Sequence, residues 1–146
     1  MKQKIYSYTL VSLQFLFIAT LLYTNDSIFS HVITFAIFSI GFVVGIYALF
    51  HNGLGNFNII PEIKDKAVLA TNGVYKYIRH PMYFSVTFMM LGVIIYNLNT
   101  FNITTFLLLI LVLFLKAKKE ELLWSKKSQA YLAYMQKTKM IIPYIL

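Results

Sequence analysis

All 13 lysine and arginine residues of this chain fall into three groups, which are separated by long apolar stretches. The basic groups are Lys2 and Lys4, then Lys64, Lys66, Lys76 and Arg79, then the seven lysines from Lys116 to Lys139. The apolar stretches are Ile5–Tyr23, roughly Ile28–Phe50, Pro81 to about Leu98, and about Ile103 to Leu115. A helix of about 20 apolar residues crosses the hydrocarbon core of a bilayer. Four such crossings place every basic residue on one side, which the positive-inside rule assigns to the cytoplasm.

The predicted fold is therefore an all-α, polytopic membrane helical bundle of about four transmembrane helices, with the N and C termini both cytoplasmic. The composition agrees, because 59% hydrophobic and 12% charged residues leave too few charges to cover a water-soluble globule. We expect one integral membrane domain, 1–146, with two N-terminal spans in 1–50 and a long loop, a helical hairpin and a tail in 51–146. The first stretch is longer than the core of a secretory signal, and no small-residue cleavage site follows it, so we expect a retained span.

The net charge of +8 limits the partners of such a chain. In a membrane protein this charge indicates orientation and contact with anionic lipid headgroups, so membrane lipids are expected as partners and nucleic acid is not. Cysteine is absent, which excludes disulfides, thiolate metal sites and a cysteine nucleophile. His31 and His51 are isolated, and no metal is expected. Because the last two apolar stretches are short, two copies could pair to bury them, and a homodimer is one expectation.

The connection from about His51 to His80 is too long for a simple turn. Long loops in compact domains are usually functional or disordered, and the apolar residues along this one favour a loop that folds back over the cytoplasmic face. It ends in Arg79-His80-Pro81, directly before the third stretch. Proline is favoured at the first position of a helix, so Arg79 and His80 lie at a helix N-terminus, which attracts carboxylate or phosphate. The alternative is that Arg79 extends to lipid headgroups and His80 only caps the helix.

Glu120 and Glu121 form the only adjacent acid pair, in a lysine-rich run that begins at Lys116. Neighbouring helix positions point about 100° apart, so one carboxylate can face the protein while the other faces water. The alternative is a solvated charge run in which Lys116 and Glu120 form an ordinary i,i+4 pair.

A hairpin brings these two features together. Pro81–Leu98 and Ile103–Glu120 are both 18 residues long, so antiparallel arms of equal length place the start of the third span beside Glu120. The cationic helix start and the carboxylate could then hold a zwitterionic ligand. The alternative is that Arg79 simply pairs with Glu120.

The segment from Leu69 to Tyr83 resembles the signature of the isoprenylcysteine carboxyl methyltransferase and phospholipid methyltransferase group. That group carries L-x-T-x-G-x-Y…R-H-P-x-Y before a helical hairpin that ends in E-E, and here the segment reads LATNGVYKYIRHPMY. A tail with Tyr131-Leu132-Ala133-Tyr134 and the late Pro143 extends the likeness, which spans about Asn56 to Pro143.

The resemblance implies a membrane-embedded methyltransferase that takes S-adenosyl-L-methionine from the cytosol and a lipophilic or amphiphilic acceptor from the bilayer. Carried over residue by residue, it assigns cofactor binding to Leu69, Ala70, Tyr75, His80, Pro81, Met82, Tyr83 and Glu120. Arg79 and Glu121 would support this pocket. Lys116 stands where an arginine contacts the acceptor in the eukaryotic carboxyl methyltransferases, so Lys116 and Arg79 are the candidates on the substrate side. Lysine lacks the bidentate fork of arginine, which puts a carboxylate acceptor in question.

The predicted function is thus methyl transfer to such an acceptor, as in the isoprenylcysteine carboxyl methyltransferases, at a site that faces the cytoplasm of a bacterial cell membrane. A phospholipid N-methyltransferase is one alternative, and a non-catalytic small membrane protein that binds a ligand is another. Membrane sterol reductases share a related C-terminal half and would bind a reduced nicotinamide, although this chain is short for them. No catalytic residue is assigned, because a carboxylate or thiolate acceptor needs no general base.

Overall fold

The computed structural model describes residues 2–25, 30–53 and 55–145, and within these ranges the fold is all-helical, as predicted. The elements are α1 (Lys2–Thr24), α2 (Val32–Asn52), the short 3-10 helix η1 (Gly73–Lys76), α3 (Pro81–Ile94), α4 (Thr100–Lys127) and α5 (Gln129–Lys137). In the described part of the chain, β-type pairing is limited to one isolated bridge between Ile78 and Lys139.

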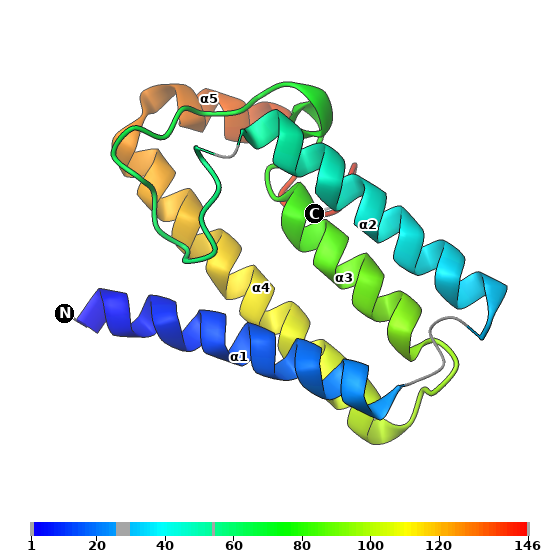
Figure 1. Cartoon of the computed structure of the whole chain (residues 1–146). Helices are drawn as coiled ribbons and strands as arrows, with labels where there is room; N and C mark the ends of the chain where they lie inside the picture. The colour runs from blue at the N-terminus through cyan, green and yellow to red at the C-terminus, as the bar shows by residue number, and fades with distance from the viewer. Residues whose placement is uncertain (1, 26–29, 54, 146) are drawn as a thin grey trace.

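The four longer helices form two antiparallel pairs, α1 with α4 and α2 with α3 (Figure 1). The start of α1, the end of α2, the start of α3 and the end of α4 lie at one end of the bundle (Figure 1). Lys119 of α4 donates to the backbone oxygen of Gln3 at this end. At the opposite end the His31 ring stacks on Tyr96, with 4.0 Å between the ring centroids. The three basic groups of the sequence therefore gather at one end of the molecule.

Three helices, α1, α2 and α4, are long and apolar enough to cross a membrane. Their exposed side chains are largely aliphatic and aromatic, which suits contact with lipid and makes this an integral membrane protein. Helix α3 has 14 residues and is about 21 Å long, shorter than a hydrocarbon core of about 30 Å. The fourth crossing therefore remains a prediction, as does the cytoplasmic side. The expected start of the second span at Ile28 lies outside the described residues.

The prediction of two equal hairpin arms is wrong. Helix α3 ends at Ile94 rather than Leu98, and α4 begins at Thr100, where the Asn99 side chain accepts a hydrogen bond from the Asn102 N–H as an N-cap. Moreover, α3 packs mainly against α2, and α4 packs mainly against α1. The expected neighbourhood still forms, because α3 and α4 converge at the end that carries the basic residues.

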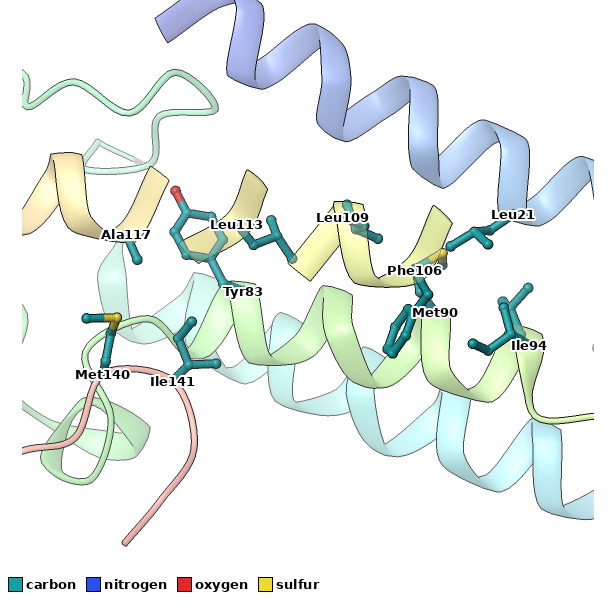
Figure 2. Packing of buried hydrophobic residues seen from close by; sticks show 11 residues of the cluster. Leu21, Tyr83, Met90, Ile94, Phe106, Leu109, Leu113, Ala117, Met140 and Ile141 are labelled. Carbon is teal, nitrogen blue, oxygen red and sulfur yellow. The ribbon is translucent and has the colours of Figure 1, made fainter. Parts of the chain in front are cut away.

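A hydrophobic core fills the space between α1, α3 and α4 (Figure 2). Leu109, Leu113 and Ala117 form a buried row along α4, in which each member follows the previous one by four positions. This spacing puts them on one face of the helix. Met140 and Ile141, from the C-terminal segment, close the core at the end that carries the basic residues (Figure 2). The core thus fixes the rotation of α4 about its axis.

Small residues allow α2 and α3 to approach closely. A Cβ atom built on Gly41 would lie 2.7 Å from the Met89 nitrogen, and one on Gly92 would lie 2.8 Å from the Phe38 nitrogen. Ser85 donates from Oγ to the Gly41 oxygen at 2.6 Å. Close backbone contact through small residues is typical of helix pairs in membranes, and here it positions the N-terminus of α3.

Candidate functional site

A cavity of about 300 Å³ lies at the end of the bundle where α3 begins. Its wall is built from α1, the loop before η1, the start of α3, the last turns of α4, and α5. All eight residues that were predicted to bind a cofactor border this one cavity: Leu69, Ala70, Tyr75, His80, Pro81, Met82, Tyr83 and Glu120. Arg79 and Lys116 border it as well, whereas Glu121 lies behind the wall. The structure therefore brings the predicted residues together, while their role in binding stays a prediction.

Arg79 and Glu121 form a buried ion pair behind the cavity. The Arg79 Nε donates to Glu121 Oε1 at 2.6 Å, and the two side chains are only 8% and 5% exposed. Arg79 Nη1 also donates to the backbone oxygens of Thr138 and Met135. Arg79 thus pairs with Glu121 and not with Glu120, and its guanidinium is held inside the protein rather than at lipid headgroups.

The C-terminal segment holds the Arg79-His80 backbone in place from the other side. The Arg79 N–H donates to the Lys139 oxygen at 2.9 Å, and the His80 N–H donates to the Met140 oxygen at 2.9 Å. The Lys139 N–H returns a hydrogen bond to the Tyr77 oxygen at 3.0 Å. These three bonds fix the direction from which the chain enters α3.

His80 occupies the N-cap position of α3, but its side chain makes no capping hydrogen bond. The ring instead lies between the two acids, with Nδ1 3.4 Å from Glu120 Oε2 and Nε2 3.6 Å from Glu121 Oε1. Burial lowers the pKa of His80, but the hydrogen bonds and charges of Glu120 and Glu121 outweigh it, so the pKa is raised. The raised pKa favours the protonated ring at this position between the two carboxylates.

Glu120 is the acid that faces the cavity. Its Oε1 accepts a hydrogen bond from the Tyr83 hydroxyl, and its side chain is 21% exposed. As expected, the two adjacent acids face different surroundings. Glu121 faces the protein interior, but Glu120 faces a cavity rather than open water. One carboxylate fixes the fold and the other is available to a ligand.

Three further tyrosines complete this side of the wall. Tyr134 of α5 donates from its hydroxyl to the Tyr75 backbone oxygen at 2.6 Å. Burial raises the pKa of Tyr75, with further contributions from Tyr134 and Glu120, and burial also raises the pKa of Tyr131. Burial raises the pKa of Tyr134 to about 12, although Arg79 acts against it. All three therefore stay neutral near pH 7 and keep their hydroxyl protons.

Lys116 does not form the i,i+4 pair with Glu120 that the sequence left open. Its side chain is 1% exposed, and Nζ donates to Gln14 Oε1 at 2.5 Å and to the Ile59 oxygen at 3.0 Å. Nζ also lies 5.4 Å from the centroid of the Tyr83 ring. Among the described residues, no carboxylate lies within 4.0 Å of this ammonium. Lys116 is thus a buried cation at the cavity wall without a direct counter-charge.

The loop after α2 folds back over this end of the bundle and lines the cavity. Glu62 in this loop borders the cavity and accepts a hydrogen bond at 3.1 Å from the buried Ser7 hydroxyl of α1. Lys127 of α4 donates to the backbone oxygens of Lys64 and Asp65 at 2.7 and 2.9 Å. The loop is therefore tied to both α1 and α4.

Sequence reasoning missed several residues of the wall. Gln14 was detectable, because a lone amide in an apolar stretch is costly in a membrane and marks a polar role. Trp124, the single tryptophan of the chain, carried no such signal. Neither did Glu62, since only the fold of the loop brings it to the cavity.

A comparison with protein families agrees with this geometry. The model of the isoprenylcysteine carboxyl methyltransferase family matches residues 32–124, which is more than half of the chain. Neither a search of curated proteins nor a search of solved structures returns a match. The matched range contains α2, the loop, α3 and most of α4, and therefore most of the cavity wall. The chain belongs to the isoprenylcysteine carboxyl methyltransferase family.

Proposed function

We propose that this protein is an S-adenosyl-L-methionine-dependent methyltransferase that acts on a lipophilic or amphiphilic acceptor at the cytoplasmic face of a membrane. The observation that carries the proposal is the cavity bordered by the start of α3 and Glu120, in a chain of this family. The gathering of basic residues at this end of the bundle supports the cytoplasmic orientation.

The donor set of the cavity fits the chemistry of this cofactor, which has a carboxylate, an ammonium, a sulfonium, a ribose and an adenine. The first turn of α3 offers a positive dipole end and the N–H of Met82, which borders the cavity, to the carboxylate, whereas the Tyr83 and Phe84 N–H groups donate to the His80 oxygen. Glu120 suits the ammonium or a ribose hydroxyl. Tyr75 and Trp124 offer aromatic faces to the adenine or to the sulfonium charge. A volume of about 300 Å³ lies at the lower end of the range for ligand pockets.

When bound, the cofactor supplies a methyl group that is activated for in-line displacement by its sulfonium. The protein has to align the acceptor with this methyl group and keep water out, so positioning and desolvation are the expected sources of catalysis. The loop tied by Ser7–Glu62 and by Lys127 covers the cavity and serves both needs. The Arg79–Glu121 pair supports the cavity from behind by fixing the entry to α3.

Of the two candidates on the substrate side, Lys116 and Arg79, Lys116 is the better one. The Nε and Nη1 donors of Arg79 are engaged by Glu121 and the C-terminal segment, whereas the Lys116 ammonium borders the cavity with two of its three donors in use. A buried cation without a direct counter-charge is costly and favours an anionic ligand group. An ammonium acceptor, as in phospholipid N-methylation, would have to lose a proton and approach this cation, so we rank it second.

Ligand titration tests the proposal directly. Because Trp124 is the single tryptophan and borders the cavity, its fluorescence reports binding in the purified full chain. We expect a response to S-adenosylhomocysteine and none to NADPH. We expect His80→Ala and Glu120→Ala to weaken S-adenosylhomocysteine binding at least tenfold, or about 1.4 kcal/mol. Binding of NADPH alone would favour the reductase alternative, and near-native affinity in both variants would refute the pocket assignment.

A further inference from the structure

Helix α1 contributes to the cavity, although it lies outside the range that the family model matches. Gln14 and Phe15 of this helix border the cavity. Gln14 is 8% exposed and is the one residue of α1 that contacts the Lys116 ammonium in the described part of the chain. The first helix therefore brings a buried polar group to the site.

The chemistry of the contact fixes how the Gln14 amide is oriented. A lysine ammonium only donates hydrogen bonds, so the group that faces Lys116 must be the amide oxygen, in agreement with the 2.5 Å contact from Nζ to Oε1. The amide nitrogen then points away from Lys116 with two further donors. Lys116 itself keeps one donor after its bonds to Gln14 and to the Ile59 oxygen.

This arrangement places a positive charge and a neutral amide side by side at the cavity wall. A neutral amide orients the ammonium without cancelling its charge, which a carboxylate at the same position would do. Apolar Phe15 of α1 and Val86 of α3 border the same cavity and suit a hydrocarbon chain. Together these groups match an amphiphile with a single anionic head.

We propose that Gln14 is a positioning and specificity-determining residue, which holds the Lys116 ammonium toward an anionic group on the methyl acceptor. The proposal rests on the proposed function, because it takes this cavity as the place where the acceptor lies. It makes α1, and not only the family motif, a determinant of which acceptor the protein takes.

Probe amphiphiles test the proposal in the full chain, reconstituted in phosphatidylcholine nanodiscs. Laurate and dodecyl phosphate carry the two candidate anions, and dodecanol is the matched uncharged control, with Trp124 fluorescence as the readout. Wild-type protein is expected to bind at least one anion ten times more tightly than dodecanol. The preferred anion distinguishes a carboxylate from a phosphate head, and equal binding of all three probes overturns the proposal.

Two substitutions separate recognition from a structural role. Gln14→Leu removes the acceptor that orients Lys116, and Gln14→Glu keeps an acceptor but cancels the charge. Both are expected to lose at least tenfold in anion affinity while binding of S-adenosylhomocysteine is unchanged. If Gln14 had only a structural role, the Gln14→Glu variant would melt at or above the wild-type temperature and would still bind the anion. This result would overturn the proposal. Thr9→Val is the matched control and should change nothing, because the Thr9 hydroxyl donates to the Ile5 oxygen of its own helix.

The remaining outcomes judge the two proposals separately. If Gln14→Glu does not fold, Gln14→Leu alone decides, because leucine is well tolerated in a membrane helix, and wild-type anion affinity in this variant overturns the role of Gln14. Failure of wild-type protein to bind S-adenosylhomocysteine refutes the proposed function. The anion measurements would still decide whether Gln14 and Lys116 recognise an anionic amphiphile.

Discussion

The ion pair between Arg79 and Glu121 is the contact whose loss we expect to damage the fold most. Both side chains are almost fully buried, and Glu121 also lies 3.6 Å from the His80 ring. The substitution Glu121→Gln keeps the size of the side chain and an oxygen that can accept the Arg79 hydrogen bond. It removes the negative charge, and Arg79 and His80 are left without this carboxylate as a partner.

The expected cost is about 3 kcal/mol in the free energy of unfolding. Breaking a buried ion pair by removing one partner costs about 3–5 kcal/mol. The lower end applies here because Arg79 keeps its bonds to the Thr138 and Met135 backbone oxygens and His80 keeps Glu120. Since about 1.4 kcal/mol is a factor of ten, the ratio of folded to unfolded protein should fall more than a hundredfold.

Unfolding by sodium dodecyl sulfate in mixed micelles, followed by Trp124 fluorescence, measures this cost. Glu120→Gln is the matched control: the neighbouring acid is more exposed, and its replacement should cost about 1 kcal/mol. Glu120→Gln should instead weaken binding of S-adenosylhomocysteine. Two results would refute the reasoning, namely a Glu121→Gln variant within about 0.5 kcal/mol of wild type, or equal costs for both acids.

Three further predictions concern packing, pH and topology. Gly92→Ala should cost about 1–3 kcal/mol of stability, because its Cβ would lie 2.8 Å from the Phe38 nitrogen; an unchanged melting temperature would show that α2 and α3 can separate freely. The raised pKa of His80 means that its charge stabilises the fold below its ordinary pKa of about 6.5, and that this contribution is lost as pH rises through the raised value. The stability deficit of His80→Gln should therefore be larger at about pH 6 than at about pH 9, and a larger deficit at high pH would contradict the assigned charge. In this cysteine-free chain, a cysteine placed within residues 97–100 should react with an impermeant thiol reagent only from outside; labelling from the cytosol would overturn the four-span topology.

Much of the fold could be predicted from the apolar stretches and the distribution of charge. The missed boundary of α3 has a local cause, since Asn97 and Asn99 favour a turn and a cap over continued helix. The Asn97 N–H donates to the Ile94 oxygen at 2.8 Å, which closes the helix early. The pairing of α2 with α3 depends on close packing at Gly41 and Gly92, which periodicity alone does not reveal.

The different directions in which Glu120 and Glu121 face could have been inferred from the sequence. Glu121 extends the buried i,i+4 row of Leu109, Leu113 and Ala117, so it must face the same interior as that row. Glu120 extends a second row through Lys116 instead, on the side of the helix that meets the cavity. Once one row is known to be buried, the two carboxylates follow from helix geometry. The sequence did not show which of these two rows would face the hydrophobic core.

The sequence did not predict the long-range contacts that join the motif to segments outside it. The motif identifies Arg79 and Lys116, but their orientations are set by the C-terminal segment and by Gln14 of α1. Both segments fall outside the range that the family model matches, 32–124. Under the proposed function, the start of α3 and Glu120 face the cofactor, whereas Lys116 and Gln14 face the acceptor. The placement of Gln14 beside Lys116 therefore makes α1 the part of this chain where acceptor selectivity should first be sought.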